Sequence, residues 1–220
     1  MELIPTQKEV LGIIQETGAL RSGHFEYKDG IHTAQHLEPA LAMRNFHNAK
    51  VLSVGLSRLL RANSEIRSMI PDLSIVAATV GGLPVAYGLC EALHARQVYF
   101  TEKEKRNAGM HFPQYVEPKP GDRVLLVDDI LRSGRLLHEA KALIESRGAE
   151  VVAVAVLFYL PTPKTAGFGA LPLYYLAELE ITCYADARSC ELCKRGVPVQ
   201  QLEGTEEREA VPAELVAMDA

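Results

Sequence analysis

Two adjacent aspartates, Asp128 and Asp129, follow an apolar run and precede a short loop, which makes them the strongest candidates for chemistry in this chain. The run Val124–Val127 is typical of a strand buried on both faces of a parallel sheet. A helical pattern begins after Ser133-Gly134. The N–H groups of such a loop and first helical turn point to one place, which predicts an anion site for a phosphate. The acids beside it suit sugar hydroxyls, or Mg²⁺ among phosphates.

A glycine turn gives a second candidate site for a phosphate. The strand expected at 73–78 ends in Thr79, Val80, Gly81 and Gly82, and a helix is expected at 85–93. Glycines at such a turn let the backbone approach a ligand closely. From the residues alone, both candidate sites have a plainer alternative, namely ordinary turns between strands and helices with two exposed aspartates nearby.

The acid pair and the residues after it resemble the 5-phosphoribosyl-1-pyrophosphate (PRPP) fingerprint of the type I phosphoribosyltransferases. The residues that carry this resemblance follow one another along the chain: Asp128, Asp129, Ile130, Leu131, Arg132, Ser133, Gly134, Arg135 and Leu136. Ser133 and Gly134 match the family's Thr/Gly-rich loop, whereas Arg135 and Leu136 depart from it. The resemblance implies that the acids hold the ribose hydroxyls and that residues 132–136 hold the 5′-phosphate. It also implies that residues 79–82, with Mg²⁺, hold the pyrophosphate.

Two further segments resemble the orotate phosphoribosyltransferases in particular. Residues 23–33 resemble their N-terminal segment, in which a lysine at the position of Lys28 contacts the pyrophosphate or the base. Residues 101–109 resemble their mobile catalytic loop, so Lys103 and Arg106 are expected to neutralise the departing pyrophosphate. In that family the loop reaches into the neighbouring subunit, which implies a homodimer. The plainer alternatives are a lysine in a hairpin turn and a solvated run of charges.

Two positions depart from the orotate pattern and keep the function open. Leu160 stands where the family has an arginine that grips the carboxylate of orotate, and His36-Leu37 stands where aromatic contact with the base is expected. The first hypothesis is a PRPP-dependent transferase of the orotate phosphoribosyltransferase type, in pyrimidine nucleotide biosynthesis. The alternatives are a catalytically impaired homologue that binds PRPP or a nucleotide and regulates, and a transferase for another base.

A Cys-x-x-Cys segment near the end of the chain raises the question of a metal. Cys190 and Cys193, with Cys183 nearby, could supply three zinc ligands, and the sequence does not identify a fourth. Because a second Cys-x-x-Cys pair is missing, a structural or local turn is favoured over a metal site.

Composition narrows the class of protein further. The chain has 220 residues and a formal net charge of −5, which argues against non-specific nucleic-acid binding. No apolar run approaches transmembrane length, and the N-terminus shows no secretory signal. Four cysteines, three of them clustered late, do not form a disulfide framework. A cytoplasmic protein with no nucleic-acid or membrane partner is the simplest interpretation of the composition. The resemblance described above implies that its small-molecule partners are PRPP and a nucleobase.

The expected architecture is α/β, with the type I phosphoribosyltransferase fold: a central, mainly parallel sheet flanked by helices and a small N-terminal hood. One domain is expected at 1–203, with 1–37 and a C-terminal part forming the hood, followed by a flexible tail at 204–220. A capping box at Thr6–Glu9 predicts a helix that ends at Gly18. Two helices are expected in 38–69, divided around Ala49-Lys50. The other expected elements are strands at 97–100, 151–158, 173–179 and 181–184, and a helix from 136 that ends at Gly148.

Overall fold

The computed structural model describes residues 5–103, 109–162 and 165–202. These residues form two compact units. The first unit contains the described parts of 1–20 and 37–180, and the second contains 21–36 and the described residues from 181 onwards. No helix in the described ranges combines the length and the apolar character that crossing a membrane requires.

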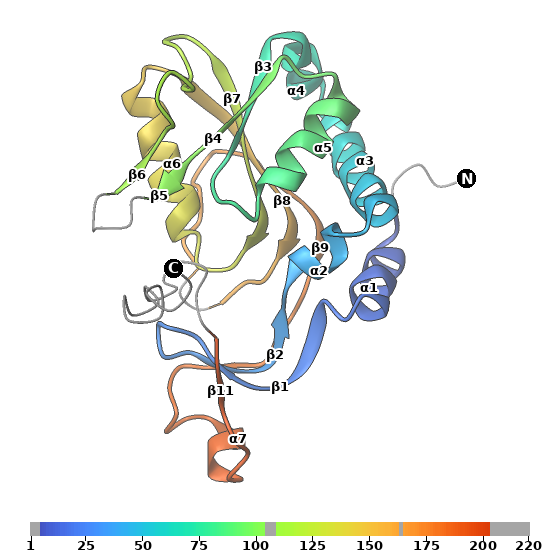
Figure 1. Ribbon diagram of the computed structural model, residues 1–220, viewed down its shortest axis with the longest axis vertical. Coiled ribbons are helices and arrows are strands. Elements are labelled where there is room, and N and C mark those ends of the chain that lie inside the picture. The colour runs from blue at the N-terminus through green and yellow to red at the C-terminus, as the bar shows by residue number, and fades with distance from the viewer. Residues whose placement is uncertain (1–4, 104–108, 163–164, 203–220) are drawn as a thin grey trace, which may run out of the picture. The chain divides into compact units, whose positions relative to one another are not determined.

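A five-stranded sheet in which every neighbouring pair is parallel forms the centre of the first unit (Figure 1). The strand order is β4-β3-β7-β8-β9. The strands are β3 (Leu73–Ala77), β4 (Gln97–Phe100), β7 (Arg123–Leu131), β8 (Glu150–Tyr159) and β9 (Leu173–Glu178). All five residues of β3 are buried, as expected for a strand covered on both faces. The predicted α/β class and parallel sheet are confirmed.

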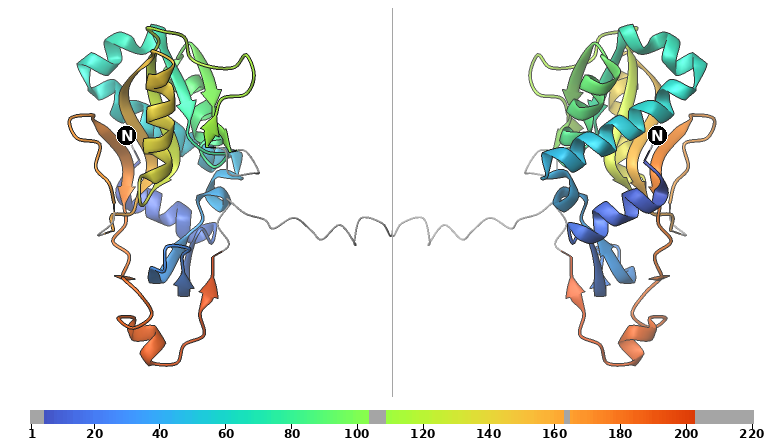
Figure 2. Two further views of the ribbon diagram at one scale, coloured as in Figure 1. Left: turned by 90° about the vertical axis from the view of Figure 1, so that its left-hand side faces the viewer. Right: turned by 90° about the vertical axis from the view of Figure 1, so that its right-hand side faces the viewer.

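Helices cover both faces of this sheet (Figure 2). Helices α3 (Phe46–Ala62) and α5 (Leu83–Leu93) pack on each other and lie over one face, and α6 (Arg135–Ser146) lies over the other. The core beneath α6 joins helix residues such as Leu137 and Ile144 to sheet residues such as Leu126 and Val154. Each helix therefore contributes one apolar stripe to a layered core. The remaining helices of this unit are α1 (Gln7–Glu16), α2 (Pro39–Met43), α4 (Ser64–Met69) and the 3₁₀ turn η1 (Ile70–Asp72).

The first helix begins as the sequence indicates. The Thr6 hydroxyl oxygen accepts a hydrogen bond from the Glu9 N–H, and the Thr6 N–H donates to the Glu9 carboxylate, so the predicted capping box is present.

The predicted division of residues 38–69 into two helices at Ala49-Lys50 is wrong. Helix α3 runs without a break from Phe46 to Ala62. The breaks fall at two asparagines, because the side chains of Asn45 and Asn63 accept hydrogen bonds from backbone N–H groups of the next helix. Three helices therefore occupy this segment.

Strand β7 is longer than the sequence suggested, because it continues for two residues beyond the acid pair. Pairing with β8 continues through Asp128 opposite Val156 to Leu131 opposite Tyr159. The two acids therefore lie within the strand near its carboxyl end, as expected, and Ile130 and Leu131, which were expected in the loop, also belong to the strand. An apolar run alone could not show this, since the pairing partner is remote in sequence.

The second unit contains a four-stranded sheet of order β10-β2-β1-β11. Strands β1 (Leu20–Glu26) and β2 (His32–Leu37) form a hairpin whose turn places Gly30 at φ 77°. The outer strands are short: β10 (Cys183–Tyr184), where a strand was expected at 181–184, and β11 (Gln200–Gln201). Between them lies the short helix α7 (Glu191–Lys194).

Candidate active site

The strand order of the first unit creates a switch point between β3 and β7. The connection from β3 runs through α5 to the edge strand β4, whereas the connection from β7 runs through α6 to β8 on the other side. Open α/β sheets bind ligands in the crevice at the carboxyl ends of two such strands. Both candidate phosphate segments of the sequence follow these two strands.

A hydrogen bond connects the two candidate segments directly. The Thr79 hydroxyl, just after β3, donates to Asp128 Oδ1 on β7 at 2.6 Å. The Asp129 N–H donates to the same oxygen at 3.1 Å. The loop is also tied to β7 through its backbone, because the Ala78 N–H donates to the Val127 carbonyl at 2.9 Å. Thr79 and the acid pair thus form one connected group.

The two glycines of the turn lie against the two carboxylates. A Cβ added to Gly81 would stand 2.8 Å from Asp129 Oδ2, and one added to Gly82 would stand 2.8 Å from Asp128 Oδ1. A side chain on either residue would therefore displace an acid. Glycine is needed at these two positions because the backbone lies so close to the carboxylates. Backbone conformation is not the reason, since both glycines have negative φ values.

Burial shapes the electrostatics of the acid pair, because Asp128 is 4% exposed and Asp129 is 8% exposed. Loss of solvent and the neighbouring carboxylate raise the pKa of Asp128 well above its usual range. Loss of solvent raises the pKa of Asp129 to about 6, and the negative charge of Glu38 acts in the same direction. Acids with such raised pKa values, at the carboxyl end of a parallel sheet, are characteristic of functional sites. A cation or a cationic substrate group beside them would be stabilised.

Two helices begin at this edge with glycine as the N-cap residue. Gly82 caps α5 and Gly134 caps α6, and neither helix has a side-chain hydrogen bond at its N-cap. The first N–H groups of a helix lack partners within the helix, and the helix dipole favours negative charge there. The two N-termini therefore provide two places where a phosphate fits.

The loop before α6 is fastened from a neighbouring segment. The Ala166 N–H donates to the Ser133 carbonyl at 3.0 Å, and the Thr165 hydroxyl donates to the Arg132 carbonyl. Gly134 has φ 80°, a conformation in which a side chain would be strained. The loop's shape is therefore held by its neighbours and by one glycine.

The departure at Arg135 is less disruptive than its sequence position suggests. Arg135 is already the first residue of α6, so it does not need the freedom of a glycine. Its guanidinium forms an ion pair with Glu139 at 2.6 Å, one helical turn along. Leu136 is the next helix residue and is partly buried.

Comparison with known proteins agrees with this geometry. A family model described as a phosphoribosyl transferase domain matches residues 61–166. The orotate phosphoribosyltransferase of Carboxydothermus hydrogenoformans is 32% identical over 184 residues, which are 84% of this chain and 91% of that protein. The chain belongs to the phosphoribosyltransferase family.

Two solved structures share the family fold. The UMP synthase of Leishmania donovani superposes with a TM-score of 0.65 at 19% identity, over 80% of this chain and 37% of that longer one. The orotate phosphoribosyltransferase of Aeropyrum pernix superposes with a TM-score of 0.61 at 20% identity, over 77% of this chain and 93% of that one. The fold predicted from the resemblance is confirmed.

The other predicted site residues of this phosphoribosyltransferase lie in three places. Lys103 is exposed on the small hairpin of β5 (Glu102–Lys103) and β6 (Met110–His111), and Arg106 lies outside the described residues. Val80 is 76% exposed within the glycine turn. Lys28 belongs to the second unit, where it is exposed in the turn between β1 and β2.

The two positions that depart from the orotate pattern have contrasting surroundings. Leu160 is 3% exposed and follows β8, and its N–H donates to the Leu131 carbonyl. In the second unit, His36 contacts the rings of Phe25 and Tyr27, with centroids 5.6 Å and 5.9 Å away. An aromatic group therefore does exist around His36, although it is not the adjacent pair that the family pattern suggested.

Three residues of the site were missed by sequence reasoning. Glu38 acts on the pKa of Asp129, the hydroxyl of Thr165 supports the phosphate loop, and the buried hydroxyl of Thr101 donates to the Ala78 carbonyl at 2.8 Å. Each acts on a segment remote in sequence. A lone glutamate or threonine gives no local signal of such a role.

Proposed function

We propose that the protein transfers the phosphoribosyl group of PRPP to a nucleobase at the carboxyl edge of β3 and β7, as in pyrimidine nucleotide synthesis. The observation that carries the proposal is the acid pair held by Thr79 against two glycines, between two helix N-termini. The homologue from Carboxydothermus hydrogenoformans, which is named orotate phosphoribosyltransferase, supports the same reaction.

In the proposed complex each segment binds one part of PRPP. Asp128 and Asp129 accept hydrogen bonds from the ribose hydroxyls. The N–H groups of residues 132–136 hold the 5′-phosphate, and those of Thr79–Gly82 hold the pyrophosphate. Two anions at two helix N-termini would fix the ribose between them. This positioning removes much of the entropic cost of bringing the base to the anomeric carbon.

The acid pair then assists the chemical step. As the bond from the anomeric carbon to pyrophosphate breaks, positive charge develops on the ribose, and a base nitrogen forms the new bond. Carboxylates in a site with little solvent stabilise that charge more than they would in water. Lys103 and Arg106 are proposed to neutralise the pyrophosphate that leaves.

The donor set suits Mg²⁺. Asp128 and Asp129 offer carboxylate oxygens, the hard ligands that this ion prefers beside substrate phosphates. A cation beside the pair would also favour the ionised form of both buried acids. When bound with PRPP, the ion supplies charge neutralisation for the pyrophosphate.

One residue, Leu160, bears on the identity of the base. Orotate carries a carboxylate, and an apolar, buried Leu160 stands where the family pattern has its arginine. Burying an anion without a partner is costly. A base without a carboxylate is therefore one alternative, and a PRPP-binding regulatory homologue is the other.

Three further predictions belong to the same proposal. The family's catalytic loop implies a homodimer, and the composition implies a cytoplasmic location. The hairpin β1–β2 and the C-terminal segment are proposed to form the hood of a single functional domain at 1–203, with a tail at 204–220. The grouping of 21–36 with residues from 181 onwards in one compact unit supports the hood assignment.

Pyrophosphate release from PRPP tests this proposal. The wild-type protein, with Mg²⁺ and PRPP, is assayed against orotate and a panel of pyrimidine and purine bases. Release that depends on one base supports a transferase and identifies its acceptor. PRPP binding without release for any base would favour the regulatory alternative, and the absence of both would overturn the proposal.

A further inference from the structure

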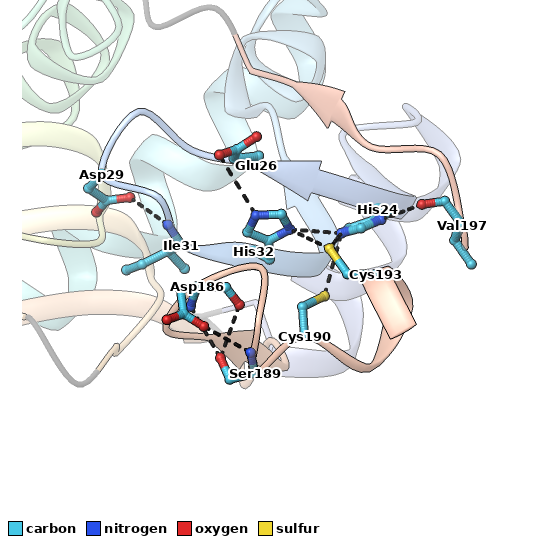
Figure 3. A network of polar contacts seen from close by, with 10 residues as sticks. All are labelled: His24, Glu26, Asp29, Ile31, His32, Asp186, Ser189, Cys190, Cys193 and Val197. Carbon is cyan, nitrogen blue, oxygen red and sulfur yellow. Dashed lines mark hydrogen bonds and ion pairs between the residues drawn. The ribbon is translucent and has the colours of Figure 1, made fainter. Parts of the chain in front are cut away.

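We propose that the second unit binds one structural Zn²⁺ ion through two histidines and two cysteines: His24, His32, Cys190 and Cys193. This site is separate from the PRPP chemistry. The sequence suggested Cys183 as a third ligand beside the Cys-x-x-Cys pair, but the cluster in the structure contains the two histidines and not Cys183. The four ligand atoms all lie within 4.8 Å of one another. Figure 3 shows the two imidazole rings facing the two thiols.

The distances between the ligand atoms match a tetrahedral zinc site. Zinc bonds of about 2.0–2.1 Å to nitrogen and about 2.3 Å to sulfur place tetrahedral N and S neighbours about 3.6 Å apart. Cys190 Sγ lies 3.4 Å from His24 Nε2, and Cys193 Sγ lies 3.6 Å from that atom and 3.5 Å from His32 Nδ1. The two ring nitrogens are 2.8 Å apart, so the rings must separate by about half an ångström around the ion.

The outer nitrogen of each ring has a partner of the kind that metal-binding histidines use. His24 Nδ1 lies 2.8 Å from the Val197 carbonyl, to which it can only donate. His32 Nε2 lies 3.7 Å from a carboxylate oxygen of Glu26. Backbone carbonyls and carboxylates in these positions orient the ring and leave the other nitrogen's lone pair for the metal.

These partners also explain why a cation belongs between the rings. If the outer nitrogen of each ring carries the hydrogen, the lone pairs of His24 Nε2 and His32 Nδ1 face each other at 2.8 Å. Two lone pairs at that distance repel unless a positive charge lies between them. A zinc ion, with two thiolates completing its charge, satisfies all four groups at once.

Burial favours a closed structural site. His24 and His32 are 2% and 3% exposed, Cys190 is fully buried, and Cys193 is partly buried. Four protein ligands leave no open position for a substrate, which distinguishes structural zinc from catalytic zinc. Cysteine and histidine also select zinc over the Mg²⁺ expected with PRPP, which prefers oxygen ligands.

The local backbone holds the two cysteines in a compact turn. The Lys194 N–H donates to the Cys190 carbonyl, and the Gly196 N–H donates to the Cys193 carbonyl at 2.9 Å. Gly196 has φ 67°, which lets the chain reverse three residues after the second cysteine. Each of the two strands of the hairpin supplies one histidine, His24 from β1 and His32 from β2.

The second unit is small, so a bound zinc ion would contribute to its stability. Its described residues, 21–36 and 181–202, amount to the scale of about 40 residues at which a metal or a disulfide usually supplements a small core. Its outer strands β10 and β11 are two residues long. A zinc ion would fasten the C-terminal segment to the hairpin that carries Lys28.

Metal analysis of the full chain, purified under reducing conditions without chelator, tests this inference. About one zinc per chain is expected, and apo protein titrated with Co²⁺ should show the visible absorption of a tetrahedral cobalt thiolate site. Less than about a tenth of an equivalent of zinc, with no cobalt spectrum on titration of reduced protein, would overturn it. Mass spectrometry that finds a Cys190–Cys193 disulfide in protein kept reduced would also overturn it.

Matched variants assign the ligands. Cys190→Ser and His32→Asn are expected to lower the zinc content at least tenfold, whereas Cys183→Ser, in the same unit but outside the cluster, is expected to retain it. Loss of zinc in Cys183→Ser equal to that in Cys190→Ser would contradict the ligand set. Since metal content is measured independently of PRPP binding, failure here leaves the proposed transferase untouched.

Discussion

The hydroxyl of Thr79 donates a 2.6 Å hydrogen bond to Asp128, which ties the turn after β3 to the acid on β7 across 49 residues of sequence. The bond favours the ionised form of Asp128, while burial and the charge of Asp129 oppose it more strongly. The ionised forms of the two acids are therefore disfavoured, and a cation or hydroxyl groups that donate to the carboxylates would stabilise them.

The first prediction concerns the pH dependence of stability. The pKa of Asp129 is raised to about 6, whereas an unfolded aspartate titrates near 3.9. Between these values the folded protein binds more protons than the unfolded chain, so stability falls as pH rises from about 4 to about 6. Asp129→Asn removes this loss and is expected to raise the unfolding free energy at pH 7 by up to about 3 kcal/mol.

Urea unfolding measured at several pH values checks the first prediction. The control is Asp72→Asn, since Asp72 is an exposed aspartate of the same unit. Its pH profile should follow that of the wild type. An Asp129→Asn protein that is less stable than the wild type at pH 7 would show that the ionised carboxylate stabilises the fold.

The second prediction concerns the glycine turn. In Gly82→Ala the new Cβ would lie 2.8 Å from Asp128 Oδ1 and 3.1 Å from the Asp128 Cα, so backbone must move. We expect PRPP affinity to fall at least tenfold, which is about 1.4 kcal/mol, with a comparable loss of stability. Gly12→Ala, in helix α1 with open space around the new Cβ, should leave affinity unchanged and add up to about 1 kcal/mol of stability. Wild-type affinity in Gly82→Ala would exclude the turn from the site.

The third prediction concerns orotate. A bidentate charge-assisted pair contributes about 1.5–3 kcal/mol, roughly ten- to hundredfold in binding, and Leu160 cannot form one. Orotate turnover in a spectrophotometric assay is expected to fall well below about 10 s⁻¹, the median for enzymes. Leu160→Arg should raise it, whereas the similarly sized Leu160→Met should not. Wild-type turnover near that median would show that another residue binds the carboxylate.

The fourth prediction is a homodimer. The loop that includes Lys103 and Arg106 resembles one that acts across a subunit interface, so a single chain would have an incomplete site. Light scattering at micromolar concentration should give about twice the chain mass of 24.1 kDa. A monomer under these conditions would leave the loop without its proposed role.

Local patterns predicted the centre of the fold well. Apolar runs identified β3, β7 and β8, because strands covered on both faces show continuous apolar sequence. The acid pair and the glycine turn were found because both follow buried strands, at the carboxyl ends where open α/β sheets bind ligands, and because the acid pair resembles the PRPP fingerprint. That the two segments meet through Thr79 follows from strand order, which the sequence does not display.

What the sequence missed depends on partners remote along the chain. The extension of β7 beyond the acids rests on pairing with β8, and the influence of Glu38 on Asp129 rests on tertiary proximity. The grouping of His24 and His32 with the Cys-x-x-Cys pair joins segments about 160 residues apart. The break within 38–69 was misplaced, although Asn45 and Asn63 were visible as N-cap residues.

The most direct test of the central claim is calorimetry of PRPP with Mg²⁺ on the wild-type protein and on Asp129→Asn. The account predicts saturable binding to the wild type and at least tenfold weaker binding to the variant, because the variant loses a carboxylate that accepts from the ribose hydroxyls. The thermal unfolding of both proteins shows that the variant is folded. Equal affinity for the two proteins, or no binding by the wild type, would contradict the assignment of the acid pair as the PRPP site.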